Sequence, residues 1–236
     1  MISGKPLTAI IPVRGGSKGI PRKNIRRVGG DSLLERAIKF AKNSPRIDRT
    51  IVTTDDPEMH EVATRYRVQS PSLRPSHLAN DSATTIAVVE HVLQECAITE
   101  GYILILQVTS PFRRLADLVD LCTVYEQSQA DAIVSLVAID EPRPEKLKRI
   151  VDGYIEPYMA EGFEGSRQAL PQPYKLNGAF YMISLEAFRR ERRFVPSSSI
   201  PFVMPDERSH NLDSMTDWKI MEVMIAAGHW TLEEYS

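Results

Sequence analysis

The sequence predicts an α/β protein with a mostly parallel central sheet that is covered by helices on both faces. Three observations support this prediction. Segments with strand character alternate with segments of helical periodicity from residue 8 to residue 138, as in chains built from β-α-β units. Residues 102–107 (YILILQ) are almost entirely apolar, which is typical of a parallel strand covered on both sides. The chain has 236 residues, of which 42% are hydrophobic, enough for one large domain with a small appendage.

Each expected element has its own local signal. Strands are predicted from short apolar, β-branched runs, and helices from apolar positions three and four residues apart behind a Ser, Thr or Asp cap. In chain order we expect a strand at Thr8–Val13, a helix capped by Ser32 and running through Ala41, a strand at Arg49–Thr54, a helix from Pro57 to about Tyr66, a helix at Thr84–Ala97, a strand at Tyr102–Gln107, a helix at Leu115–Ser128 and a strand at Ala132–Ala138.

The region from about residue 140 to 175 breaks this alternation. It opens on the charged, proline-bearing stretch 141–149 (EPRPEKLKR), and glycines and prolines follow through residue 172. We expect a small lobe inserted into a single domain that spans residues 1–236. Residues 177–183 (NGAFYMI) return to strand character, and Ser214–Ala227 is expected to close the fold as a helix with Gly228 just after it.

A basic loop follows the first predicted strand. No Asp or Glu occurs from Met1 to Gly30, while six Lys or Arg residues occur from Arg14 to Arg27. Gly15 and Gly16 expose backbone N–H groups without a Cβ in the way, and such groups suit phosphate oxygens when cations stand beside them. The loop lacks the spacing of a Walker A motif or of G-x-G-x-x-G. The loop therefore indicates an anionic ligand such as a nucleoside triphosphate. The simpler alternative is a solvent-exposed basic loop without a ligand, or a nuclear-import signal.

Polar loops follow three of the predicted parallel strands. Ligands bind beyond the carboxyl ends of such strands. The basic loop, Asp55-Asp56 and Thr109–Arg114 are therefore expected to meet at one crevice.

A series of motifs resembles, in order and over nearly the whole chain, that of the acylneuraminate cytidylyltransferases, the CMP-sialic acid synthetases. The matching segments are RGGSKGIPRKN at Arg14–Asn24, TTD at Thr53–Asp55, LRP at Leu73–Pro75 with LAND at Leu78–Asp81, QVTSPFR at Gln107–Arg113, RQALP at Arg167–Pro171 and NGAFY at Asn177–Tyr181. The resemblance implies a three-layer, Rossmann-like nucleotidyltransferase fold. It also implies a reaction in which CTP and a nonulosonic (sialic-acid-like) sugar give a CMP-sugar and pyrophosphate.

The resemblance also implies roles for individual residues. Arg14, Lys18 and Asp213 would be the catalytic residues. Nucleotide binding would fall to Arg14, Gly15, Gly16, Ser17, Lys18, Lys23, Asn24, Arg74, Ala83 and Thr85, and sugar binding to Gln107, Lys146, Arg167, Gln168 and Tyr181. In the family, the region around 146–168 belongs to a dimerisation lobe that reaches the partner's active site. We therefore expect a homodimer.

The expected cofactor is Mg²⁺, because the family carries S-x-D-x-D before its last helix. Here the segment reads Ser209-His210-Asn211-Leu212-Asp213, so the first Asp is replaced by an uncharged amide. We expect one firm Mg²⁺ site on Asp213 and the triphosphate, with Asn211 as a weaker ligand.

Composition excludes other classes of function. A net charge of −2 argues against a nucleic-acid partner. No apolar run is long enough for a membrane span. Cys96 and Cys122 are expected to be buried hydrophobes rather than a disulfide, so we expect a cytoplasmic protein.

Three alternatives remain open from the sequence. One is a CMP-Kdo synthetase, whose loop resembles P-A-R-x-x-S-x-R-L-P-x-K more than the loop found here. Another is a nucleotide-binding regulator with impaired catalysis, which Asn211 favours. The last is a basic protein-docking module.

Overall fold

The computed structural model describes residues 1–159 and 171–235. Within these residues the main sheet has six strands in the order β10-β6-β9-β5-β1-β4. Its strands are β1 (Leu7–Pro12), β4 (Arg49–Thr53), β5 (Tyr102–Ile105), β6 (Ala132–Ala138), β9 (Tyr174–Ser184) and β10 (Ser199–Val203). β1 pairs in parallel with both β4 and β5, and β6 with β10, whereas β9 runs antiparallel between β5 and β6. The expected mostly parallel sheet is confirmed, with β9 as the exception.

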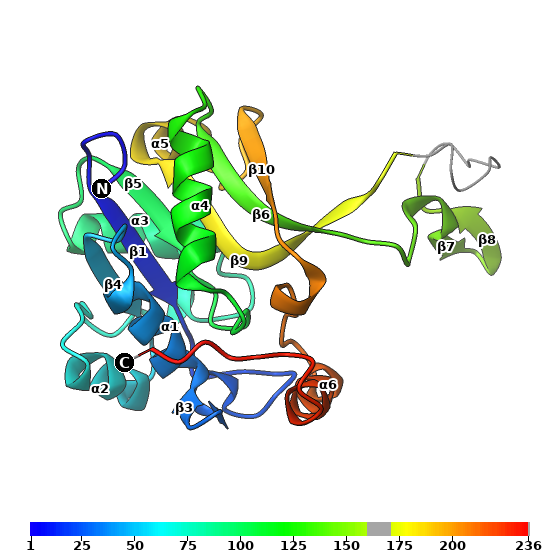
Figure 1. The fold of residues 1–236 in the computed structure, drawn as a ribbon, viewed down its shortest axis with the longest axis horizontal. Helices are drawn as coiled ribbons and strands as arrows, with labels where there is room; N and C mark the ends of the chain where they lie inside the picture. Colours follow the sequence, from blue (N-terminus) through cyan, green and yellow to red (C-terminus); the bar gives the residue numbers. More distant parts are fainter. Residues whose placement is uncertain (160–170, 236) are drawn as a thin grey trace.

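Helices cover both faces of the sheet (Figure 1). Alternate residues of β1 explain why: Ala9 and Ile11 are buried with α1 (Leu33–Asn43), α2 (Pro57–Arg65) and α4 (Leu115–Glu126). Ile10 is buried on the other face with α3 (Thr85–Glu95) and α5 (Leu185–Glu191). A strand buried on both faces must be largely apolar, as β1 is apart from the buried Thr8.

The helix starts follow the predicted caps. Ser32 and Glu35 form a reciprocal capping box at α1, the carboxylate of Asp56 accepts from the backbone of α2, and the hydroxyl of Thr84 accepts from Ala87 N. The closing helix α6 (Met215–Ala226) begins with a Ser214–Asp217 capping box, and Gly228 just beyond it has φ +74°. Neither α5 nor β10 was expected.

Residues 140–159 and 171–175 leave the body of the fold, as Figure 1 shows. β6 and β9 continue as a pair to Ala138 and Tyr174, and beyond them β7 (Lys148–Val151) and β8 (Tyr154–Pro157) form an antiparallel hairpin. We call residues 147–159 the arm.

The remaining elements are short. They are the β2–β3 pair (Arg27–Val28 and Asp31–Ser32) and the 3-10 turns η1 (Lys23–Ile25), η2 (Ser76–Leu78), η3 (Pro144–Lys146) and η5 (Asp206–Arg208). Cys96 and Cys122 are free and buried. Among the helices of the described part of the chain, none is long and apolar enough to cross a membrane.

Candidate functional site

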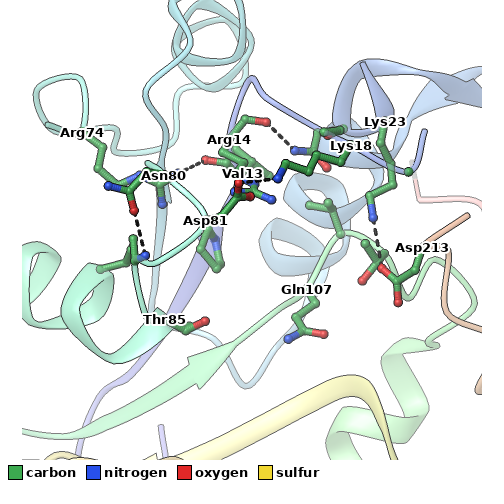
Figure 2. Close-up of a pocket in the computed structure, with 18 of the residues that line it drawn as sticks. Val13, Arg14, Lys18, Lys23, Arg74, Asn80, Asp81, Thr85, Gln107 and Asp213 are labelled. Atoms are coloured by element: carbon green, nitrogen blue, oxygen red, sulfur yellow. Dashed lines mark hydrogen bonds and ion pairs between the residues drawn. The ribbon is translucent and has the colours of Figure 1, made fainter. Parts of the chain in front are cut away.

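A cleft of about 610 Å³ lies beyond the carboxyl ends of β1 and β5. Parallel strands place these ends at the same edge of the sheet, as expected for a ligand site. The cleft is lined by the loop after β1 (Pro12, Val13, Arg14, Ser17, Lys18, Gly19, Lys23, Asn24), by Arg74 and the segment leading into α3 (Leu78, Asn80, Asp81, Ala83, Thr85, Val88), by the turn after β5 (Gln107, Val108, Thr109) and by Asn211 and Asp213. Figure 2 shows side chains from these segments around one hollow.

The basic loop places two cations against one carboxylate. Nη1 of Arg14 lies 3.0 Å from Asp81, and Nζ of Lys18 lies 2.5 Å from the other oxygen of the same carboxylate. The Lys18 side chain is 77% exposed and that of Asp81 55%. The hydrogen bonds from Lys18 and then Arg14 lower the pKa of Asp81. The cleft therefore presents cations to solvent, offset by the carboxylates of Asp81 and Asp213.

Close contacts constrain Gly15 and Gly19 of this loop, whereas a Cβ on Gly16 would have no neighbour within 4 Å. Neither Gly15 nor Gly16 has a positive φ. A Cβ on Gly15 would lie 2.7 Å from an oxygen of Asp56, and one on Gly19 would lie 2.0 Å from the backbone oxygen of Asp213. At Gly19 this close approach brings the loop against the segment before α6.

Asn24 and Arg74 hold the first wall of the cleft in place. The Asn24 amide donates to the backbone oxygen of Arg14 at 2.9 Å. Nη2 of Arg74 donates to the oxygen of Val13 at 2.6 Å and lies 3.5 Å from Asp55. Burial lowers the pKa of Arg74, whose side chain is only 4% exposed. Both residues line the cleft, but their hydrogen bonds go to the protein backbone.

Asp55 and Asp56 support the basic loop from behind. Gly15 N donates to Asp55 at 3.2 Å, and Asp56 caps α2. The two carboxylates are not among the residues that line the cleft. The prediction that three loops line one cleft is therefore confirmed for the loops after β1 and β5. The loop after β4 instead packs behind the basic loop and supports it.

The opposite wall is the turn after β5. Gln107 projects from it into the cleft (Figure 2). Arg113 braces the turn, because its Nε donates to the oxygen of Ser110 at 2.9 Å and its Nη2 donates to the oxygen of Gln107. Burial lowers the pKa of Arg113 to about 10. Gly178, with φ +76°, lies so close that a Cβ there would meet the Gln107 side-chain oxygen at 2.5 Å.

Asp213, Asn211 and Lys23 form the third corner. Lys23 donates to the backbone oxygen of Leu212 at 2.7 Å and lies 3.2 Å from the Asp213 carboxylate. The Asn211 amide nitrogen donates to the other Asp213 oxygen at 2.6 Å. The Asp213 side chain is 68% exposed.

This corner fits a magnesium ion only in part. One carboxylate and one amide are hard oxygen donors of the kind that Mg²⁺ prefers. In the described residues, no group of three His, Cys, Asp or Glu side chains is placed to hold a metal. The remaining ligands would have to come from water and from a phosphate-bearing ligand, which is the usual arrangement for Mg²⁺.

Several expected site residues lie elsewhere. Gly15 and Gly16 are in the basic loop but do not line the cleft. Tyr181 is on β9 and packs on the α3–α5 side of the sheet, where burial raises its pKa. Lys146 is in η3, next to the arm, and pairs with Glu141 at 2.6 Å. Arg167 and Gln168 lie outside the described residues.

Nine residues that line the cleft were not expected as site residues. They are Pro12, Val13, Gly19, Leu78, Asn80, Asp81, Val88, Val108 and Thr109. In the sequence, Asp81 was only the last residue of the Leu78–Asp81 motif. Lys18 lies 63 positions before it, and no sequence pattern predicted that the two side chains would form an ion pair. Gly19 was visible only as one more glycine of the loop.

Comparisons with known proteins agree on one family. Residues 8–196 match the model of the family described as cytidylyltransferase. The pseudaminic acid cytidylyltransferase of Campylobacter jejuni is 29% identical over 224 residues, which are 93% of this chain and 96% of that protein. The N-acylneuraminate cytidylyltransferase of Escherichia coli is 28% identical over 91% of this chain and 51% of its own length. The CMP-N,N'-diacetyllegionaminic acid synthase of Legionella pneumophila is 27% identical, covering 93% of this chain and 96% of that protein.

Solved structures share the fold at lower identity. A CMP:2-keto-3-deoxy-manno-octonic acid synthetase complexed with CTP has a TM-score of 0.69 at 15% identity, covering 94% of this chain and 99% of that chain. A 4-diphosphocytidyl-2C-methyl-D-erythritol synthase has a TM-score of 0.63 at 17% identity, with the same coverage. The three-layer fold is therefore the one that these synthetases share.

Proposed function

Because this chain belongs to the cytidylyltransferase family, we propose that it transfers CMP from CTP to a nonulosonic, sialic-acid-like sugar acid and releases pyrophosphate. The observation that carries the proposal is the cleft at the ends of β1 and β5. Cations of one loop stand there on one side, and Gln107 and the Asn211–Asp213 corner stand on the other. Relatives named for pseudaminic, N-acylneuraminic and legionaminic acids support the substrate class.

The nucleotide is proposed to bind along the basic loop. Arg14, Lys18 and Lys23 supply charge-assisted hydrogen bonds to the phosphates. Ala83 and Thr85, at the start of α3 and in the lining of the cleft, face the base. Asn24 and Arg74 keep the wall rigid, so that the phosphates meet donors already in position.

The reaction joins one oxygen to one phosphorus. The hydroxyl on C2 of the sugar acid attacks the α-phosphorus of CTP, the bond from that phosphorus to the bridging oxygen of pyrophosphate breaks, and the hydroxyl proton passes to water. Positioning and charge stabilisation provide most of the rate in such a transfer. Arg14 and Lys18 are placed to stabilise the charge that develops on the leaving pyrophosphate.

Asp213 is proposed to hold Mg²⁺ together with the triphosphate, and Asn211 to offer its amide oxygen. The ion supplies charge neutralisation at the phosphates when bound. Asn211 turns its amide nitrogen, not its oxygen, toward Asp213 in this structure. Its oxygen must therefore reorient to serve as a ligand, which suits a weak second contact.

The sugar end is proposed to be completed by a second copy of the chain. Gln107 lies in the cleft. Lys146 lies in η3 beside the arm and does not line the cleft of its own chain. In a homodimer joined through the arm, Lys146, Arg167 and Gln168 would meet the partner's cleft. Tyr181 is assigned to packing behind that end of the cleft rather than to contact with the sugar. We propose a cytoplasmic location, where CTP is available to the reaction.

The test is to supply CTP and Mg²⁺ with sialic, pseudaminic, legionaminic or 2-keto-3-deoxy-manno-octonic acid and to measure pyrophosphate release. One of the first three acids is expected to give rapid release. Release with the octonic acid alone would move the protein to the Kdo group. No release with any acid, despite CTP binding, would favour the impaired regulator.

A further inference from the structure

Asp81 occupies the cationic end of the cleft in this structure. It lines the cleft, and its two carboxylate oxygens lie 3.0 Å from Arg14 and 2.5 Å from Lys18 (Figure 2). These are two of the three side chains that the proposed function assigns to the phosphates. A carboxylate oxygen and a phosphate oxygen are the same kind of partner for an ammonium or a guanidinium group.

The loop that carries Asp81 does not need the carboxylate for its shape. The side-chain oxygen of Asn80 accepts from Ser82 N at 3.0 Å, from the Ser82 hydroxyl at 2.8 Å and from Ala83 N at 2.9 Å. In the described part of the chain, the Asp81 carboxylate has ion pairs only with Arg14 and Lys18. Its position is therefore a consequence of the charges in the cleft and not of the local turn.

Other acidic residues near the basic loop do not take this place. Asp213 pairs with Lys23, and Glu58 of α2 pairs with Arg22. Asp55 faces Arg74 and Gly15 N. Asp81 alone, among the described residues, contacts both Arg14 and Lys18.

We propose that Asp81 is an internal competitor for the phosphate groups, which lowers the affinity of the cleft for pyrophosphate and so favours its release after CMP transfer. This inference rests on the proposed function. An incoming triphosphate carries several charges and displaces the single carboxylate. When pyrophosphate starts to leave, Asp81 is already within reach on its loop and pairs again with Lys18 and Arg14.

The exposure of the pair suits this exchange. Both side chains of the Lys18–Asp81 pair are more than half exposed, and exposed ion pairs are weak because water screens them. If the Lys18–Asp81 pair were buried, it would be too strong for CTP to displace. If Asp81 were absent, Lys18 and Arg14 would bind pyrophosphate without competition and retain it. The same logic makes Asp81 a determinant of selectivity for more highly charged ligands over less charged ones.

The test is a calorimetric titration of pyrophosphate into the wild-type chain and three variants, once with EDTA and once with Mg²⁺. Asp81→Asn removes the charge and keeps the shape. Asp81→Glu keeps the charge. Glu58→Gln removes an equal charge near the same loop, from a residue outside the lining of the cleft. Each protein is also titrated with CTP, and its melting temperature is recorded.

The expected result is that Asp81→Asn binds pyrophosphate at least fivefold more tightly than wild type in both conditions and is more strongly inhibited by it during turnover. Asp81→Glu and Glu58→Gln should stay within about twofold of wild type. Equal or weaker binding by Asp81→Asn overturns the proposal, and tighter binding with EDTA but weaker binding with Mg²⁺ overturns it in favour of a metal-ligand role. An equal gain in pyrophosphate affinity in Glu58→Gln also overturns the proposal, because the effect would then come from the net charge of the protein and not from the position of Asp81. If the wild-type chain binds no CTP, the proposed function itself has failed.

Discussion

Lys18 and Arg74 are cations of the same cleft, but they differ in burial and in partners. The Lys18 side chain is 77% exposed and pairs with Asp81, while that of Arg74 is 4% exposed and donates to the Val13 backbone. An exposed cation is available to a ligand, whereas a buried one that satisfies a backbone oxygen is part of the fold. Substitution should therefore separate binding from stability.

Lys18→Ala is expected to weaken CTP binding about tenfold or more with no change in melting temperature. A hydrogen bond to a charged group contributes about 1.5–3 kcal/mol to binding. The fold does not depend on a hydrogen bond from Lys18, so its stability should not change. Calorimetry and thermal melting measure the two effects. Arg74→Ala is the comparison: it leaves the Val13 oxygen unpaired and should lower stability by about 1–3 kcal/mol. A lower melting temperature for Lys18→Ala, with unchanged CTP affinity, would contradict the assignment.

Asn211→Asp is expected to lower the Mg²⁺ concentration needed for half-maximal activity. The substitution replaces an amide that donates to Asp213 with a second carboxylate beside it. Two adjacent carboxylates repel each other, and a divalent cation relieves the repulsion. The same variant should show a larger Mg²⁺-dependent rise in melting temperature without nucleotide. Identical magnesium titrations of the two proteins would remove the argument.

Among the elements, the turn after β5 depends on a buried arginine. Arg113 has no carboxylate partner in the described part of the chain; its charge is met by the backbone oxygens of Ser110 and Gln107 and by the rings of Phe40 and Phe180, 5.7 and 5.8 Å away. The Tyr235 hydroxyl donates to the Arg113 oxygen at 2.8 Å. The turn that presents Gln107 is thus fixed from inside the core.

Arg113→Met is expected to destabilise the protein by about 2–5 kcal/mol, because the buried oxygen of Ser110 and the partly buried oxygen of Gln107 lose their donor at about 1–3 kcal/mol each. Urea unfolding measures the loss. The neighbouring Arg114 is exposed, so Arg114→Met should change stability by less than about 0.5 kcal/mol. Similar values for the two variants would show that Arg113 does not brace the turn.

The arm presents two different faces. Ile150 pairs with Ile155 across β7 and β8, so both side chains lie on one face, and they are 79% and 76% exposed. Arg149 pairs with Glu156 at 2.9 Å on the other face. A pair of exposed isoleucines is the kind of surface that a second copy covers.

Ile150→Asp combined with Ile155→Asp is expected to convert the proposed dimer to a monomer and to reduce turnover, because Lys146 and its neighbours would no longer meet the partner's cleft. Sedimentation equilibrium gives the oligomeric state. Glu156→Gln changes the opposite face of the same hairpin and should leave the dimer intact. A wild-type chain that sediments as a monomer with full activity would contradict the proposed assembly.

Across the molecule, the sequence predicted the layers and the place of the cleft better than the strand order. Apolar runs such as 102–107 indicate strands that are buried on both faces, and this predicts helices on both sides of the sheet. Such runs do not indicate the direction of a strand, so the antiparallel course of β9 between β5 and β6 could not be predicted. β10 was missed because its residues, SIPFV, contain a proline and follow a polar stretch.

The site was predictable where residues are close in sequence. The basic loop, with its cations at Arg14, Lys18 and Lys23, lies in the cleft as expected. Contacts between distant segments were not visible, and Asp81 against Lys18 is the main example. Tyr181 lies on the α3–α5 face of the sheet, because the alternation of β9 decides which face each side chain takes. The sequence alone did not give the register of β9.

The whole chain is expected to melt at a higher temperature with CTP and Mg²⁺ than without them. A ligand at 100 times its dissociation constant stabilises the native state by about 2.7 kcal/mol, which corresponds to about 5–10 °C for a protein of this size. Differential scanning fluorimetry with each of the four nucleoside triphosphates provides the measurement. An equal shift with all four would show that only phosphate is recognised, and no shift would support the docking-module alternative.

The bond from Lys23 to the backbone of Leu212 spans 189 positions, and Gly19 touches Asp213 over a similar distance. Synthesis proceeds from the N-terminus, at about 5–20 residues per second. On the ribosome, the basic loop therefore emerges many seconds before the segment that completes its corner. A nascent chain arrested before residue 211 would display these cations to any polyanion in the cell while lacking the Asp213 carboxylate that is proposed to hold the metal.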